Sequence, residues 1–390
     1  MIHLRIKNFK CFHDIDIPIN QLTVFAGANG NGKSTAIQSL LFLRKTIEHC
    51  AKWENTRYNL TELNGLNVEM NEVYCLHLGN SAYVLPVDFD ETEVRIGLKS
   101  NGDEFSVTYS TNTGNELWLT PIEPLINKLK ANPLYFQEFY YLNAERIGPR
   151  LSQGIKFYDY PNVGFKGEYT AQIISNLNFL FKPEEGRVNT EHLKGNRFEH
   201  HINAWLEFII EGASIIPHYD DKTHTARIEV QDSYSKGNPI VPTNTGFGIS
   251  YALPVIVTGL MALKDRFLIV ENPEAHLHPR AQSRMGYFFG IIANDGVRVI
   301  IETHSDHIIN GIQLAVAKQK IKHSDVSINY FNKPVKSEAE ELENKAFKTK
   351  TQPDVLPIGI TAKGELTEWP SGFFDQSQID FAALFKIRKG

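Results

Sequence analysis

The sequence predicts an α/β fold, and three observations lead to that prediction. Near the start, a short apolar run over residues 22–26 stops at a glycine-rich stretch, and helical spacing of apolar residues follows. In the second half, two continuous apolar runs typical of buried strands alternate with helical stretches. Between these regions, short segments with the two-residue period of half-buried strands are separated by turn residues.

Most strands are expected in the N-terminal part of the chain. Ile2, Leu4 and Ile6 alternate with polar residues, and residues 15–19 repeat the pattern. Asn101-Gly102 is a hairpin-turn signal inside a predicted meander over residues 66–120. The other elements expected here are strands over 83–89, 93–98, 105–109 and 140–144, and helices over 33–52 and 121–140.

In the later part of the chain, predicted helices and buried strands alternate regularly. A mixed stretch over 150–196 precedes it, and a Lys/Glu-rich stretch over 333–350 that is expected to be a solvated linker follows it. Without internal repeats or sustained heptads, no long coiled coil is expected. The predicted elements are a helix over 200–211, a hairpin over 213–232, helices over 248–263, 279–293 and 306–317, and buried strands over 267–270 and 297–303.

Composition excludes several classes of protein. The chain has 390 residues, 42% of them apolar, with 40 Lys plus Arg against 45 Asp plus Glu and a formal charge of -5. That is too apolar for a disordered chain and too acidic for a protein that coats DNA. The three cysteines show no CxxC spacing, so neither disulfides nor a thiolate zinc site is expected.

A cytoplasmic location is the resulting expectation. The N-terminus has no apolar core typical of a signal peptide. The longest apolar run, residues 251–263, is shorter than the roughly 18 residues that a membrane span needs, so no membrane partner is expected.

The strongest motif is Gly27-Ala-Asn-Gly-Asn-Gly-Lys33-Ser34, which matches GxxxxGK[ST] between a predicted strand and a predicted helix. Glycines let backbone N–H groups converge on phosphate oxygens, and the helix N-terminus adds its positive dipole. Lys33 can reach the β and γ phosphates, and Ser34 can hold Mg²⁺. The predicted ATP-binding residues are Asn29, Gly30, Asn31, Gly32, Lys33, Ser34 and Thr35.

Two buried strands end in polar groups suited to the same chemistry. The first ends at Glu271, a Walker B arrangement in which a carboxylate and Ser34 hold Mg²⁺ beside the phosphates. The second ends in Thr303-His304, where an imidazole can sense the γ-phosphate or polarise water. A helix opened by Gly246 precedes both strands and offers another phosphate-binding end, or simply a turn.

This order of motifs resembles the ABC-type AAA ATPases of the SMC, RecF and overcoming-lysogenisation-defect group, and among them a bacterial subfamily with a C-terminal domain of unknown function. The resemblance spans nearly the whole chain, and Septu-like ATPase–nuclease pairs are the nearest example. It rests on Asn8-Phe9-Lys10 and on residues 27–34, 141–149, 246–250, 271–279, 303–306 and 364–375.

The resemblance implies an ABC-type head that pairs head-to-tail with a second copy and encloses ATP and Mg²⁺. Gly246, Gly248 and Ser250 would be the signature that meets the partner's nucleotide, and His304 the switch histidine. Gly246 replaces the usual serine. The implied domains are an N-lobe over 1–150, an inserted mixed domain over 151–245, a C-lobe over 246–330, and a linker with an aromatic tail over 331–390.

One departure from the family pattern concerns catalysis. ABC heads carry a second acid after the Walker B acid, whereas Asn272 follows Glu271 here. An amide can orient water but cannot take its proton. The catalytic candidates are therefore Glu271, Glu274 as a substitute base, and His304, and hydrolysis is expected to be slow.

Weaker patterns favour ordinary structural explanations. The histidines at 276, 278, 304 and 307 could suggest a metal site, but they lack matching cysteines. The polar cluster over 218–224 favours a hairpin turn over a cation site. Residues 199–203 favour an amphipathic helix over a nuclease motif. Glu145-Arg146 could contact nucleotide or a partner head, or form a structural ion pair.

The expected function is ATP-driven dimerisation that gates a separately encoded effector, a nuclease, in bacterial anti-phage defence. Overcoming-lysogenisation-defect nucleases append a Toprim domain, but residues 305–390 contain no DxD pair, so no such domain is expected there. The alternatives are a RecF-like clamp that binds DNA in repair and a nucleotide-locked scaffold with little turnover.

Overall fold

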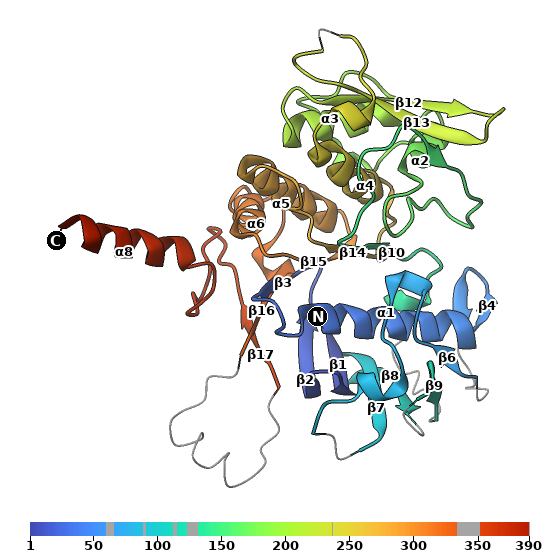
Figure 1. Cartoon of the computed structure of the whole chain (residues 1–390). Coiled ribbons are helices and arrows are strands. Elements are labelled where there is room, and N and C mark those ends of the chain that lie inside the picture. Colours follow the sequence, from blue (N-terminus) through green and yellow to red (C-terminus); the bar gives the residue numbers. More distant parts are fainter. Residues whose placement is uncertain are drawn as a thin grey trace.

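A central mixed sheet divides the protein (Figure 1). The computed structural model describes residues 1–59, 66–88, 91–111, 115–122, 132–235, 237–333 and 352–389. From β10 to β16 neighbouring strands run parallel, and β17 closes one edge antiparallel, so the predicted α/β class is confirmed. In spatial order the strands are β10 (Tyr140–Leu142), β14 (Phe267–Glu271), β15 (Arg298–Glu302), β3 (Leu22–Gly27), β16 (Val326–Asn332) and β17 (Asp354–Ile358).

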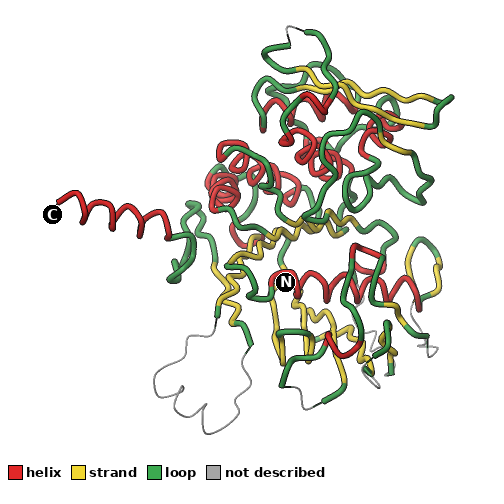
Figure 2. Tube along the Cα trace, viewed as in Figure 1, coloured by secondary structure: helices red, strands yellow, loops and turns green. Residues whose placement is uncertain are grey.

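Each face of this sheet packs into its own core because successive side chains of a strand point to opposite faces. Val24 and Leu268 pack with α4, α5 and α6 on one face, whereas Phe25 and Ile269 pack with α1 on the other. Figure 2 shows the strands running between these helices. The helices are α1 (Lys33–Cys50), α4 (Phe247–Met261), α5 (Pro279–Asn294) and α6 (Asp306–Ala317), close to their predicted bounds.

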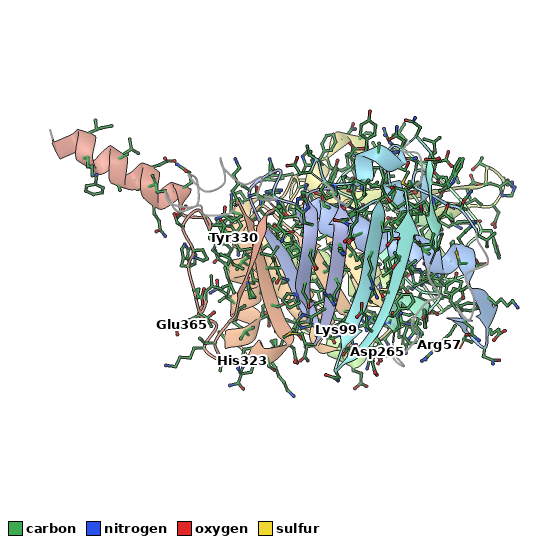
Figure 3. The ribbon with its side chains drawn as sticks, turned by 90° about the horizontal axis from the view of Figure 1, so that it is seen from below. Arg57, Lys99, Asp265, His323, Tyr330 and Glu365 are labelled. Atoms are coloured by element: carbon green, nitrogen blue, oxygen red, sulfur yellow. The ribbon has the colours of Figure 1, made fainter. Side chains whose placement is uncertain are left out.

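An antiparallel sheet covers the α1 side and confirms the predicted meander. In Figure 3 it faces the viewer, with Lys99 at the end of β7. Its strands in spatial order are β2 (Phe12–Ile19), β1 (Ile2–Phe9), β7 (Glu93–Ser100), β8 (Asp103–Ser110), β9 (Trp118–Pro121) and β6 (Val68–Glu69). A separate ribbon pairs β4 (Lys52–Glu54) with β5 (Arg57–Asn59).

A third layer covers the outer side of α4 and α5. Its apolar side chains, such as Phe198 and Ile215, belong to the same core as Val24 of the central sheet. The proposed insertion over 151–245 therefore shares its interior with the second lobe, and the domain division remains a prediction. The layer contains β11 (Gln153–Gly154), α2 (Thr170–Leu177), α3 (Phe198–Ile209), β12 (Ser214–Asp220) and β13 (Thr225–Gln231).

Two predicted elements are wrong within the described residues. The strand expected over 83–89 is absent from residues 83–88, and the 3-10 turn η2 (Ser81–Val84) lies at its start. The helix expected over 121–140 is replaced by the end of β9 and the 3-10 turn η3 (Pro133–Tyr135), while 123–131 lie outside the described residues. The other 3-10 turns are η1 (Val73–Cys75), η4 (Glu185–Arg187), η5 (Pro242–Asn244) and η6 (His323–Asp325).

Arg44 explains the missing helix after residue 132. This fully buried guanidinium on α1 donates to the carbonyl oxygens of Leu134 and Phe136, each at 2.5 Å, and of Gln137 at 2.9 Å. Those carbonyls are the groups that a helix would need for its own backbone bonds. Residues 134–137 are therefore held against α1 in an irregular conformation.

The C-terminal part was predicted only as a linker and an aromatic tail. Residues 334–351, where the linker was expected, lie outside the described residues. Beyond them β17 extends the central sheet, and Phe373 packs against Tyr330 with ring centroids 5.1 Å apart. The last helix, α8 (Gln376–Lys389), projects away from the body (Figures 1 and 3). In the described part of the chain, no helix is both long and apolar enough to cross a membrane.

Candidate nucleotide-binding site

The loop between β3 and α1 requires glycine at two positions. Gly27 has φ 133° and Gly32 has φ 92°, backbone conformations that side chains with a Cβ rarely adopt. A Cβ on Gly27 would also overlap the carbonyl oxygen of Phe331 on β16, and one on Gly32 would press on the ring of Phe12. These glycines allow the loop to fold tightly against two neighbouring strands.

Lys33 points back into this loop. It is only 3% exposed, and its Nζ donates to the carbonyl oxygens of Gly27 and Ala28, each at 2.9 Å. Burial lowers the pKa of Lys33, while the nearby carboxylates of Glu302 and Glu274 oppose that change. No side chain caps the first turn of α1, so its amide groups remain available to an anion.

A cleft of about 440 Å³ opens above the loop at the C-terminal edge of the parallel strands. This is where open α/β sheets place their ligands. Asn31 does not line the cleft; its amide donates to the carbonyl of Phe331 at 3.2 Å and anchors the loop. The other predicted residues of this loop and the two strand ends do line it: Asn29, Gly30, Gly32, Lys33, Ser34, Thr35, Glu271 and His304.

Sequence reasoning missed several residues of the cleft. Lys10 and Cys11, from the turn between β1 and β2, line its wall. Glu302, at the end of β15, lies in register with Glu271 and accepts a hydrogen bond from Ser34 Oγ at 2.9 Å. The signal for Glu302 was present, because it is an acid that ends a buried strand in the same way as Glu271.

The two adjacent carboxylates resist ionisation together. Burial raises the pKa of Glu271 to about 7, with the negative charge of Glu302 as the next cause. Burial also raises the pKa of Glu302, against the hydrogen bond from Ser34 and the charge of Lys33. Glu302 is 5% exposed, and its Oε2 has no hydrogen-bond partner. A buried, partnerless carboxylate oxygen beside a second carboxylate and a serine hydroxyl fits a hard divalent cation such as Mg²⁺.

Tyr141 orients Glu271. Its hydroxyl donates to Glu271 Oε1 at 2.9 Å and accepts from Asn143 Nδ2 at 2.8 Å. Tyr141 belongs to β10, the strand beside β14, and Asn143 follows that strand directly. Glu271 is therefore held by its neighbouring strand, while Glu302 is held by the phosphate loop itself.

Glu274 and His304 form a second unit at this edge. The carboxylate of Glu274 accepts from Thr303 Oγ1 at 2.8 Å and from the backbone N–H of His304 at 2.7 Å. Glu274 is not among the residues that line the cleft, whereas the exposed His304 is. Partial loss of solvent around the ring, and then the charge of Lys33, lower the pKa of His304, which favours the neutral imidazole. Glu274 thus fixes the backbone that carries His304.

Arg146 fixes the segment that follows Glu271. It is 3% exposed, and its guanidinium donates to the carbonyl oxygens of Glu271 at 2.7 Å and Asn272 at 2.6 Å. Among the described residues Arg146 forms no ion pair, and it is not part of the cleft lining; Glu145 pairs instead with Lys166 at 3.6 Å. The guanidinium holds Asn272 at φ 43°.

The predicted signature residues lie outside this cleft. Gly246 precedes the first turn of α4, which contains Gly248 and Ser250, and none of the three lines the phosphate-loop cleft of their own chain. In a head-to-tail dimer such residues would face the partner's site, so this placement is compatible with the expectation and does not test it.

The weaker candidates remain ordinary structure in the described residues. No group of three His, Cys, Asp or Glu side chains there could hold a metal ion, which includes the histidines at 276, 278, 304 and 307. Asp220 closes the β12–β13 turn by accepting from the N–H groups of Lys222 and Thr223, as the hairpin prediction required. Residues 199–203 lie within α3.

The parallel sheet, the phosphate loop and the carboxylates at neighbouring strand ends together define a P-loop nucleotide-binding domain of the AAA class. The family comparisons agree. Residues 22–310 match the family described as "AAA domain, putative AbiEii toxin, Type IV TA system", and the chain belongs to this AAA family. Residues 321–384 match a second family, described as a protein of unknown function (DUF3696).

Similar proteins include a nuclease and two SMC head domains. The OLD nuclease of Thermus scotoductus is 22% identical over 374 residues, which cover 88% of this chain and 66%, just under two thirds, of the nuclease. An Smc head bound to the C-winged helix domain of ScpA is 11% identical with a TM-score of 0.47, covering 92% of this chain and 97% of that one. The SMC head domain of Thermotoga maritima is 13% identical with a TM-score of 0.41, covering 91% and 97%.

Proposed function

We propose that this protein binds Mg²⁺·ATP in the phosphate-loop cleft and hydrolyses it slowly. The observation that supports this most is the hydrogen bond between Ser34 and Glu302, because it joins the phosphate loop to a pair of buried carboxylates. Lys33 would leave the loop carbonyls to neutralise the β and γ phosphates. Ser34, Glu271 and Glu302 would hold Mg²⁺, which, when bound, neutralises charge on the transferred phosphoryl group.

Each remaining polar side chain has a role in this proposal. The neutral imidazole of His304 polarises the attacking water. Glu274 positions His304, since both of its oxygens already accept hydrogen bonds. The carboxylate oxygen of Glu302 without a partner is the best-placed acceptor for the proton of water, and Asn272 cannot take that proton. Slow turnover follows because metal binding and proton acceptance compete for Glu302.

Dimerisation is the proposed output of nucleotide binding. The signature turn at Gly246–Ser250 lies away from its own chain's cleft, as needed if two heads enclose ATP between them. We propose a homodimer or higher oligomer in the cytoplasm that gates a separately encoded nuclease in anti-phage defence. The relatedness to an OLD nuclease supports the nuclease context.

Two alternatives have a specific observation each. A RecF-like DNA clamp is favoured by a cluster of cations on the flank formed by α5 and the end of α6. A nucleotide-locked scaffold is favoured by Asn272 at the position of the second acid.

ATP turnover with and without DNA, measured on protein co-purified from its native operon, separates these functions. A stoichiometric nuclease in that sample supports gating, whereas DNA-stimulated turnover without a second protein supports the clamp. Lys33→Met should abolish ATP binding, and Lys52→Met, at an exposed residue of β4, should not. Unchanged ATP binding in Lys33→Met would contradict the assigned site.

The missing acid can be tested in single-turnover experiments. Asn272→Glu should raise the rate if the second acid is limiting, but at φ 43° a glutamate adds backbone strain of about 1 kcal/mol. Asn272→Asp is the matched variant, because Asp tolerates this conformation better. If neither variant is faster than the wild type, the missing acid does not limit hydrolysis.

A further inference from the structure

A second, larger cleft lies on the flank of the molecule. It has a volume of about 710 Å³ and shares no lining residue with the phosphate-loop cleft. Its walls come from the segment around residues 186–191, from α3, from α5 and from the chain after α6. On α5 it extends from Arg280 to Asn294, a distance of about 20 Å at 1.5 Å per residue.

Positive charge is concentrated in this cleft, although the whole chain carries a formal charge of -5. Arg280 and Arg284 lie one turn apart on α5, and Lys318 and Lys320 follow α6; the only acid in the lining is Glu191. Arg280 pairs with Glu211 at 2.9 Å, but both side chains are more than 60% exposed, so water screens that pair strongly.

The other three cations have no ion-pair partner among the described residues. Burial and the like charge of Arg280 lower the pKa of the Arg284 guanidinium, while the negative charges of Glu211 and Glu207 oppose that change without forming an ion pair with it. A guanidinium and two ammonium groups in this situation are ready to bind an anion.

The floor of the cleft is aromatic. Trp205, Phe208 and Tyr287 form a continuous cluster, with ring centroids 5.6 Å apart for Trp205–Phe208 and 5.7 Å apart for Phe208–Tyr287. Arg284 lies over the ring of Phe208 at 5.2 Å, and Lys318 Nζ lies 5.5 Å from the centroid of Tyr287. The cations are thus held directly above flat apolar surfaces.

We propose that this flank cleft binds a nucleotide unit, with the phosphate on Arg284, Lys318 and Lys320 and the base against Phe208 and Tyr287. Arginine and lysine bind phosphate oxygens, and bases stack on aromatic rings and guanidinium planes. An acidic peptide would satisfy the charges but would leave the aromatic floor unused. The unit is carried by a free nucleotide or by a strand of nucleic acid, and the site is separate from the ATP cleft.

Fluorescence anisotropy of the full chain with a labelled oligothymidylate tests the proposal. The double variant Lys318→Glu and Lys320→Glu should weaken binding about tenfold and reduce its salt dependence. Phe208→Leu should weaken it about fivefold with unchanged salt dependence, because it removes stacking and leaves the charge. Lys52→Glu, at an exposed cation on β4 far from this flank (Figure 1), is the control and should bind as the wild type does.

Competition identifies the source of the nucleotide unit. Displacement of the oligonucleotide by thymidine monophosphate supports a free nucleotide, and displacement only by longer strands supports nucleic acid. Lys33→Met should bind the oligonucleotide normally, so loss of the ATP site and loss of the flank site are distinguishable. The proposal is overturned if the wild type binds neither probe, or if Lys52→Glu weakens binding as much as the lysine double variant does.

Discussion

Arg146 supports the segment that carries the Walker B acid, and Arg146→Met should destabilise the protein. The guanidinium donates to the carbonyls of Asn143, Glu271 and Asn272 at 3.1, 2.7 and 2.6 Å. Burial lowers the pKa of Arg146 from 12.5 to about 10, which corresponds to a cost of about 3 kcal/mol for burying the charge. Three hydrogen bonds from a charged donor contribute roughly 4.5 to 9 kcal/mol. The net loss in the free energy of unfolding is therefore about 2 to 6 kcal/mol.

Urea denaturation followed by tryptophan fluorescence measures this loss. Arg146→Lys should fall between the wild type and Arg146→Met, because an ammonium group keeps the charge but lacks the planar fork. Arg150→Met, at an exposed position four residues away, should change stability by no more than about 0.5 kcal/mol. The affinity for Mg²⁺·ATP should also fall in Arg146→Met, since Asn272 would no longer be held at φ 43°. If Arg146→Met unfolds at the wild-type urea concentration with the same slope, these three hydrogen bonds provide no net stability and the reasoning fails.

Three further predictions concern stability. Gly311→Ala should lower the free energy of unfolding by about 1–3 kcal/mol, seen as a lower melting temperature, because the added Cβ would overlap the carbonyl oxygen of Ser283. The control Gly154→Ala, whose Cβ meets open space, should melt as the wild type does. Burial raises the pKa of Glu271 from 4.5 to about 7, so the stability that its protonated form provides is present below pH 4.5 and is lost as the pH rises from there to about 7. Glu271→Gln should therefore raise the melting temperature of the nucleotide-free protein at pH 8 and leave it unchanged at pH 4. Arg187→Met should cost about 3–5 kcal/mol in denaturant melts, since Asp295, 2.7 Å from Arg187 Nε, would be left with the half-exposed Lys264, 3.5 Å away; an equally stable variant would show that the Arg187–Asp295 pair contributes nothing.

The fold was predictable where the local sequence pattern, such as apolar spacing or a capping residue, favours the same element that tertiary packing stabilises. The helix from Asp306 to Ala317 begins after Ser305, whose hydroxyl caps its first turn, and ends where the prediction placed it. The stretch after residue 132 failed because Arg44, nearly ninety positions earlier, takes its carbonyls. A long-range hydrogen bond of this kind leaves no periodic signal in the sequence.

The location of the site was predictable from the sequence, but the contacts between its side chains were not. The phosphate loop and the two strand ends follow from motif and strand order, and they do meet in one cleft. Which carboxylate touches Ser34 could not be predicted, since it depends on β15, and not β14, lying beside β3. For that reason the sequence named Ser34 and Glu271 as Mg²⁺ ligands and missed Glu302, the carboxylate that accepts the hydrogen bond from Ser34.

The contact between α5 and α6 has a mechanical consequence. At Gly286 and Gly311 the two helices approach so closely that a Cβ on either would overlap a carbonyl oxygen of the other helix, with no flexible side chains between them to absorb sliding. The pair acts as a stiff lever that starts beside His304 at the nucleotide edge, and the flank cleft runs along its α5 side from Arg280 to Asn294. Because backbone contacts backbone at both glycines, the two helices are expected to tilt together. If ATP tilts the lever, it changes the oligonucleotide affinity of the flank by the same factor by which an oligonucleotide changes the affinity for ATP.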